Sequence, residues 1–144
     1  MTLVDTNLLI YATFEDAPEH ARARAWLAEK LHDEAAPVAL CWPVVYAFVR
    51  LITSPRVFAQ SAVSLAHGWA TVEGYLRQPN VVLVSHGSKH QRIAAAMAAT
   101  PGLRSDDVPD VELAALAIEH GLTLASHDAG FRRFEGLRTI DPLA

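Results

Sequence analysis

Short apolar runs alternate along the chain with longer segments in which apolar residues recur at helical spacing. The short runs predict strands over 2–5, 38–41, 81–85 and 123–126, with a last strand over 137–140. The longer segments predict helices over 18–34, 43–52, 62–77, 88–99 and 108–120. Strands separated by helices indicate an α/β fold with a central parallel sheet of four or five strands.

The helix predicted over 43–52 differs from the others because its sequence after Pro43, VVYAFVRLI, is apolar nearly all round. That pattern is typical of a buried helix, and Pro43 suits its first turn. The segment SPRVF that follows, 54–58, is predicted to be a break. Gly121 is expected to end the helix that begins at 108.

The composition is that of a folded domain, with 51% hydrophobic and 19% charged residues. A chain of 144 residues suits a single domain over 1–144. No apolar run reaches the ~18 residues of a membrane span, and the first residues, which carry Asp5 early, lack the basic segment of a signal peptide. Cys41, the one cysteine, lies in an apolar run and is expected to fill the core. We therefore expect a cytoplasmic protein without membrane association.

The net charge of −4 argues against a protein that binds nucleic acid through an overall basic surface. Contact with nucleic acid would depend on metal ions or on local arginines. Arg132 and Arg133 follow the strand predicted over 123–126, while Arg50 and Arg56 flank a Ser-Pro pair. A planar guanidinium suits phosphate, so these four are candidate phosphate contacts. A solvated surface role stays open for each.

Three aspartates stand at positions that favour a shared site. Asp5 follows the first predicted strand, Asp128 follows the strand over 123–126, and Asp110 lies in the first turn of the helix that begins at 108. Each has a plainer explanation as a turn or cap residue. In a parallel sheet, however, sites lie beyond the carboxyl ends of the strands, at the point where the strand order reverses. The three carboxylates are therefore expected to converge.

Neighbouring polar residues are candidates for support. Thr6 and Asn7 follow Asp5 and either orient its carboxylate or cap the next helix. Asp107 belongs to the run SDDVPD, whose three aspartates exceed what a helix cap requires. Glu112, two residues beyond this run, is expected to face solvent.

Clustered carboxylates repel one another and need a cation. Ligation by oxygen alone favours the hard ions Mg²⁺ or Mn²⁺ over zinc. Such an ion activates water and stabilises the charge that builds on a phosphodiester under attack. The chain has no Cys/His cluster at zinc spacing and none of the glycine-rich phosphate loops or nucleophile-elbow motifs. The candidate chemistry is therefore metal-dependent phosphodiester hydrolysis.

Three stretches together resemble PIN-domain ribonucleases of the VapC type, the toxins of VapBC toxin–antitoxin pairs. They are VDTNLLIYA, WPVVYAFVRLITSPRVF and VPDVELAALAIEHGLTLASHDAGFRRF. The resemblance spans nearly the whole chain. It implies a three-layer α/β/α fold, a magnesium-dependent endoribonuclease and a cognate VapB-type antitoxin. The family acids correspond to Asp5, Asp110 and Asp128, which the resemblance implies are catalytic and metal-binding.

Two positions depart from the family pattern. Ala47 stands where the family usually has a glutamate, although relatives with the same PRVF signature often have a small residue there. Gly130 stands where a further acid often follows. These departures leave the number of metal ligands open. They also motivate an alternative function, a catalytically weak PIN domain that binds RNA or its antitoxin.

A phosphatase of the haloacid dehalogenase type is a second alternative, because Asp5 follows a first strand. That chemistry requires another acid at the position of Asn7 and a late lysine, and the late basic residues here are arginines. The sequence disfavours this alternative.

Large apolar side chains around 18–34 and 43–77 also favour a homodimer. Five aromatic residues exceed what so small a domain is expected to bury, and interfaces favour aromatic residues. They are Trp26, Trp42, Phe58, Trp69 and Tyr75.

Overall fold

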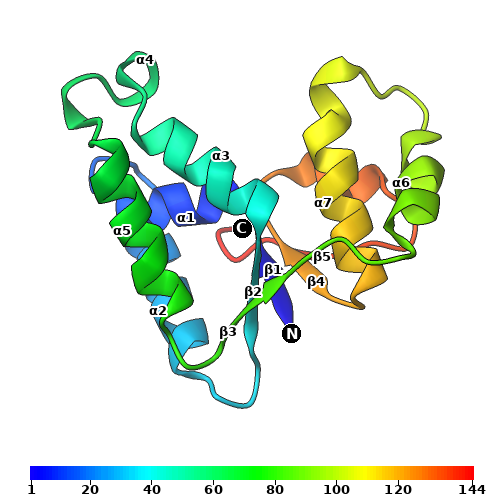
Figure 1. Ribbon diagram of the computed structural model, residues 1–144, viewed down its shortest axis with the longest axis horizontal. Coiled ribbons are helices and arrows are strands. Elements are labelled where there is room, and N and C mark those ends of the chain that lie inside the picture. The colour runs from blue at the N-terminus through cyan, green and yellow to red at the C-terminus, as the bar shows by residue number, and fades with distance from the viewer.

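The computed structural model describes all 144 residues and contains one sheet of five parallel strands (Figure 1). The strands are β1 (Thr2–Val4), β2 (Val38–Cys41), β3 (Val81–Val84), β4 (Thr123–Ala125) and β5 (Arg138–Ile140). Their order across the sheet is β3-β2-β1-β4-β5, and every neighbouring pair is parallel. The predicted parallel sheet, including its last strand, is confirmed.

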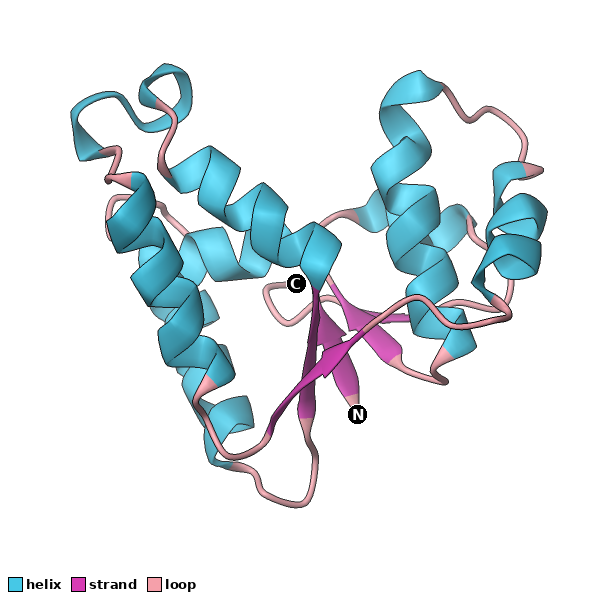
Figure 2. Ribbon diagram, in the orientation of Figure 1, coloured by secondary structure: helices cyan, strands magenta, loops and turns pink.

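Seven α-helices cover the sheet in two groups (Figure 2). One group holds α1 (Thr6–Thr13), α2 (His20–His32), α3 (Trp42–Ile52), α4 (Pro55–Phe58) and α5 (Leu65–Leu76). The other group, on the opposite side of the sheet, holds α6 (His90–Ala98) and α7 (Val108–Glu119). The three-layer α/β/α arrangement is therefore confirmed, and the five predicted helices lie within two or three residues of the expected bounds.

The core is one cluster of 28 buried residues, built around the central strands. All four residues of β2 are buried, because neighbouring strands and helices cover this strand on every side. Cys41, its last residue, is fully buried, as expected of a core filler. Gly121 has a φ of 65° just after α7, the left-handed conformation that commonly ends a helix.

The strand order reverses at β1. From β1 the chain adds β2 and then β3 on one side, and it returns through α6 and α7 to add β4 and β5 on the other. The connections that leave β1 and β4 therefore diverge, which opens a crevice at their carboxyl ends. The register pairs Val4 with Ala125, so Asp5 and Ser126 leave the sheet side by side.

Two local expectations are wrong. The SPRVF segment forms one helical turn, α4, because Pro55 fits the first position of a helix. The helix α3 is not buried all round. Its residues Tyr46 and Arg50 are exposed, since α5 covers only part of its surface.

The expected exposure of five aromatic residues is confirmed for two. Trp42 and Trp69 are 39% and 36% exposed. Trp26, Phe58 and Tyr75 instead pack against the core. Phe58 stacks edge-on against Phe14 with ring centroids 4.6 Å apart, and Tyr75 packs against Phe48.

None of the helices combines the length and the apolar character that crossing a bilayer requires.

Candidate active site

Asp5 connects the central strand to the first helix. Its backbone N–H donates to the carbonyl of Ala125 at 3.0 Å, which continues the ladder between β1 and β4 by one residue. Its side chain then caps α1, where Oδ1 accepts the backbone N–H of Thr6 at 2.7 Å. The carboxylate is thus fixed by the end of the strand and by the start of the helix.

Ser126 is the central hydrogen-bonding residue of the site, and it is only 4% exposed. Its Oγ donates to Asp5 Oδ2 at 2.6 Å and accepts from the backbone N–H of Asp128 at 3.0 Å. Asn7 Nδ2 donates to the same Oγ at 3.2 Å, while Asn7 Oδ1 accepts the backbone N–H of His127 at 3.4 Å. Ser126 therefore ties the segment after β4 to the segment after β1.

Sequence reasoning missed Ser126, because a serine after a strand is also a common turn residue. The available signal was its position. Ser126 is the first residue after its strand, as Asp5 is after its own, and parallel pairing of the two strands makes these positions neighbours.

Asp110 lies in the first turn of α7 and forms an ion pair with Arg133. Arg133 Nη2 donates to Asp110 Oδ2 at 3.2 Å and to Asp107 Oδ1 at 3.0 Å. Asp107 is fixed in turn, since its Oδ2 accepts the backbone N–H of Arg104 at 2.8 Å. Asp107 therefore holds Arg133 beside Asp110.

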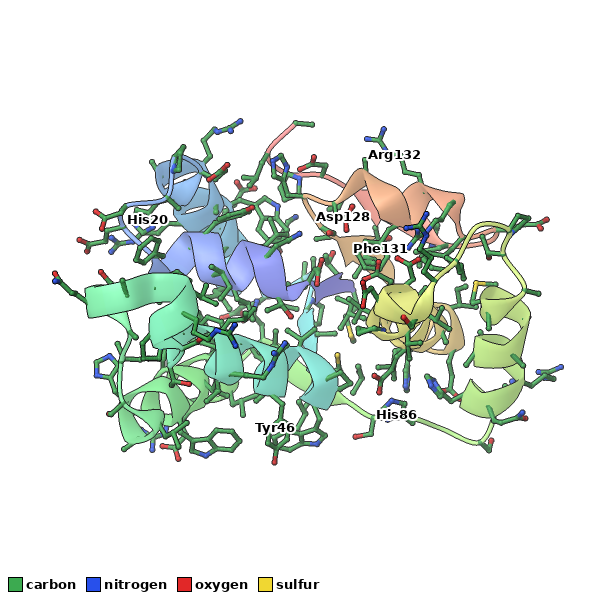
Figure 3. The ribbon with its side chains drawn as sticks, turned by 90° about the horizontal axis from the view of Figure 1, so that it is seen from above. His20, Tyr46, His86, Asp128, Phe131 and Arg132 are labelled. Carbon is green, nitrogen blue, oxygen red and sulfur yellow. The ribbon has the colours of Figure 1, made fainter.

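Asp128 is exposed and caps the short 3₁₀ segment Ala129–Arg133. Its Oδ1 accepts the backbone N–H of Gly130 at 2.8 Å. A Cβ on Gly130 would lie 3.0 Å from that oxygen, so the glycine leaves room for the carboxylate. Phe131 is buried and anchors the segment, while Asp128 and Arg132 border a cavity of about 50 Å³ (Figure 3).

A second cavity, of about 70 Å³, joins two of the acids. Asp5 lines it from the end of β1, Thr6 from α1 and Asp110 from α7. Ala47 lines it from α3. The position at which the family usually has glutamate therefore borders the space between Asp5 and Asp110.

The electrostatics of the site indicate a shortage of positive charge. Burial raises the pKa of Asp5 above its ordinary value, and the charge of Asp128 raises it further. Burial and the charges of Asp128 and Asp5 raise the pKa of Asp110 to about 6, although Arg133 opposes the shift. The three carboxylates therefore interact with one another, and one arginine does not neutralise them.

The four candidate arginines divide into two pairs. Arg133 contacts Asp110, and Arg132 lines the cavity beside Asp128. Arg50 borders a different, apolar hollow between α3 and α5, and Arg56 lies exposed on α4. Only the first pair lies with the acids.

The donor set fits a hard divalent ion. It consists of carboxylate oxygens whose mutual repulsion an ion would relieve. As the side chains lie, no three His, Cys, Asp or Glu groups meet around one point. Binding would therefore require the carboxylates to draw closer together.

Comparison with known proteins agrees with the observed fold. A PIN domain family model matches residues 2–137. Ribonuclease VapC33 of Mycobacterium tuberculosis is 37% identical over 143 residues, covering 99% of each chain. Ribonuclease VapC37 of the same organism is 36% identical over 144 residues, covering 100% of this chain and 99% of its own.

Solved structures show the same fold at low identity. VapBC-1 from nontypeable Haemophilus influenzae matches with a TM-score of 0.72 and 12% identity, covering 99% of this chain and 98% of its own. VapBC2 from Rickettsia felis, bound to a DNA fragment from its promoter, matches with a TM-score of 0.69 and 15% identity, covering 96% of each chain. The match to the PIN domain family argues against the alternative of a haloacid dehalogenase-type phosphatase. The chain belongs to the PIN-domain family, among its VapC-type members.

Proposed function

We propose that this protein is the toxin of a cytoplasmic toxin–antitoxin pair, an endoribonuclease that requires Mg²⁺ or Mn²⁺ and cleaves RNA. The observation that carries the proposal is the gathering of Asp5, Asp110 and Asp128 where the strand order reverses. Relatives that span the same length are called ribonuclease VapC, which supports the choice of RNA as substrate.

The three carboxylates would hold the ion, which supplies an activated water and neutralises charge on the phosphodiester. Asp5 is oriented for this task by the Thr6 amide and the Ser126 hydroxyl. Arg133 neutralises part of the negative charge next to Asp110 and is the first candidate for a phosphate contact. Arg132, on the rim beside Asp128, is the second candidate for a phosphate contact.

RNA cleavage by the purified protein tests this proposal. We expect activity with Mg²⁺ or Mn²⁺ and none with a chelator. Asp5→Asn, Asp110→Asn and Asp128→Asn should each lower the rate by about 10²- to 10³-fold. Asp106→Asn is the matched control, because Asp106 lies exposed in the same acidic run without a contact to the site. Full activity of all three site variants would contradict the proposal.

The same assay distinguishes the alternative of a catalytically weak binding module. Ala47 motivates that alternative, since it removes one acid from the cavity that Asp5 and Asp110 share. If the protein is only a binding module, it binds RNA but does not cleave it, whichever divalent ion is added. We favour the enzyme because three acids remain.

We also propose a VapB-type antitoxin as partner. Several structural neighbours are complexes named VapBC, which supports this choice. A basic side chain of the antitoxin would supply the positive charge that the carboxylates lack when no ion is bound. Co-expression with the product of the adjacent short reading frame should yield a stable complex without nuclease activity. Recovery of the two proteins separately would count against it.

We further propose that the protein forms a homodimer through the apolar surface of α3 and α5. Tyr46, Leu65 and Trp69 are 62%, 69% and 36% exposed around a hollow of about 610 Å³. Trp42, Tyr46 and Trp69 form a continuous aromatic row with ring centroids 6.2 and 5.7 Å apart. Permanent dimer interfaces are richer in apolar and aromatic groups than other surfaces.

Light scattering of the chain alone tests the dimer. We expect a dimer for the parent and for the control Val57→Lys on α4, and a monomer for Tyr46→Lys. A monomeric parent would contradict this part of the proposal and would leave the surface to the antitoxin.

A further inference from the structure

A second group of titratable side chains lies away from the acidic site, where the segment after β3 meets α7. It consists of His86, His90, Glu112, Glu119 and His120. In Figure 3 His86 lies on the opposite side of the molecule from Asp128 and Arg132. Three histidines and two glutamates at one junction of elements need an explanation, because the proposed function uses none of them.

The two histidines of the 86–90 segment lie against each other. Their rings are 4.3 Å apart between centroids and nearly perpendicular, at 88°. His86 Nε2 forms a hydrogen bond of 2.8 Å with Glu112 Oε1, and both side chains are partly exposed, at 40% and 38%. His86 is therefore free to exchange that partner for another.

Glu119 lies beneath the segment and is almost buried, with 6% of its side chain exposed. Its two oxygens accept the backbone N–H groups of Gly87 at 2.8 Å and Lys89 at 2.9 Å. A Cβ on Gly87 would lie 2.7 Å from Glu119 Oε2, so the glycine allows the chain to wrap around the carboxylate. The hydrogen bonds from these two amides, that of Gly87 foremost, lower the pKa of Glu119, which keeps it ionised.

His90 supplies the observation that points to a ligand. Its Nδ1 is buried and has no hydrogen-bond partner. That nitrogen is 4.0 Å from Glu119 Oε1, and His120 Nε2 is 3.9 Å from the same oxygen. An unpartnered buried nitrogen is unfavourable, since the group has lost its contact with water. An ion between the ring and the carboxylate would satisfy both.

We propose that His86, His90 and Glu119 form a site for a borderline divalent ion, Zn²⁺ or a close analogue. Imidazole nitrogen with one carboxylate oxygen selects such ions, whereas an all-carboxylate set selects Mg²⁺. His120 is not a ligand through Nε2, because that nitrogen bonds the carbonyl of Ser85 at 2.7 Å. Water would complete the coordination.

Binding requires the three side chains to draw together. No three side chains meet around one point as they lie. Bonds of ~2.0–2.1 Å to a tetrahedral ion place neighbouring ligand atoms about 3.3 Å apart. The 4.0 Å between His90 Nδ1 and Glu119 Oε1 must therefore shorten by less than an ångström, and His86 must release Glu112.

The ion would join the 86–90 segment to the end of α7, whose first turn carries Asp110. Its role in this position is structural. It adds a constraint between β3, α6 and α7 without occupying the acidic site.

Calorimetric titration of the whole protein with Zn²⁺, in millimolar Mg²⁺ to occupy the acidic site, tests the proposal. We expect one Zn²⁺ per chain and a rise in melting temperature. His86→Ala and His90→Ala should each weaken binding at least about tenfold. His32→Ala, an exposed histidine on α2, and Asp128→Asn, in the acidic site, should bind Zn²⁺ as the parent does.

Two further variants keep the test decisive. Glu119→Gln removes the charge and keeps an oxygen acceptor for only one of the two amides, and Gly87→Ala displaces the carboxylate. Both should weaken Zn²⁺ binding while circular dichroism still reports a folded protein. Equal affinity in His86→Ala and the parent would overturn the proposal, because His86 is partly exposed and its loss does not threaten the fold. Loss of the Zn²⁺ signal in Asp128→Asn would also overturn it, by assigning the ion to the acidic site.

Discussion

The acidic site and the histidine–glutamate group both lie where loops leave the sheet, yet they balance charge differently. Burial and the charge of Asp128 raise the pKa of both Asp5 and Asp110, and one arginine, Arg133, opposes the shift of Asp110. Glu119, by contrast, is stabilised as an anion by two backbone amides next to His90, whose pKa is lowered by burial. A site poor in positive charge suits a hard ion and a phosphodiester, whereas a group rich in imidazole nitrogen suits a structural ion. The predictions below test this contrast.

Among the substitutions that follow, Ser126→Ala should have the largest effect. The substitution removes the donor to Asp5 and leaves the Asp128 amide and the Asn7 side chain without their acceptor. We expect RNA cleavage to fall about 10- to 100-fold and the free energy of unfolding to fall by about 1–3 kcal/mol. Ser85→Ala is the control, because Ser85 is the exposed first residue after β3. Equal effects of the two changes would show that Ser126 has no special role.

Asp110→Asn should make the ion-free protein more stable at neutral pH. Asp110 has a pKa of about 6 in the fold against 3.8 for the free side chain, so the folded state holds its proton more tightly. The stability that this proton contributes is complete below pH 3.8 and is lost as the pH rises through about 6.

The size of this effect is set by the exposure of Asp110. Because 28% of its side chain is exposed, we expect ionised Asp110 to lower the free energy of unfolding of the parent by about 1–2 kcal/mol at pH 7. Urea unfolding of both proteins without divalent ions, at pH 4 and pH 7, measures it. From pH 4 to pH 7 the free energy of unfolding of Asp110→Asn should rise relative to that of the parent. The same difference between the two proteins at both pH values would contradict the raised pKa of Asp110.

Ala47→Glu tests whether the cavity between Asp5 and Asp110 is the vacant position of a fourth acid. Without metal, added repulsion should lower stability by about 1–2 kcal/mol. With millimolar Mn²⁺ the loss should be recovered, because the ion binds only the folded state. Thermal melts with and without Mn²⁺ give the answer. Equal destabilisation in both would mean that the new carboxylate does not reach the ion.

Ala59→Gly should have the smallest effect and concerns neither site. Ala59 follows α4 with φ 50° and ψ −122°, a conformation that favours glycine. Glycine there should raise stability by about 0.5–1 kcal/mol without changing RNA cleavage or Zn²⁺ affinity. Gly74→Ala is the control for a backbone substitution inside a helix. A Cβ at this exposed position of α5 meets open space, so alanine should also stabilise the protein. A loss of activity in Ala59→Gly would instead connect this turn to the acidic site.

The sequence was sufficient for the sheet and for the positions of the three acids next to strand ends and in a first helical turn, because both depend on local rules. Apolar runs marked the strands. Asp5 was conspicuous as an acid directly after such a run, and Asp128 as an acid shortly after another. The inference that they converge required only parallel strands with a reversal of order.

Other features depend on packing between distant segments and could not be predicted. Tyr46 is exposed because α5 covers one side of α3, which the apolar pattern of α3 does not reveal. His86, His90 and Glu119 come together only because β3 and α6 lie against α7, so no zinc-like spacing exists along the chain. The interaction of Arg133 with Asp107 and Asp110 likewise depends on the path of the segment after β4.

Mn²⁺ binding measures most directly whether the three carboxylates share an ion. Titration of the parent, followed by the paramagnetic signal of free Mn²⁺, should show saturable binding, and Asp5→Asn, Asp110→Asn and Asp128→Asn should each weaken it strongly. Asp106→Asn should bind as the parent does. Asp128 is the sharpest case, because its carboxylate is exposed and bonds the Gly130 amide rather than the other acids. Parent-like Mn²⁺ affinity in Asp128→Asn would contradict the shared site on which the proposed ribonuclease depends.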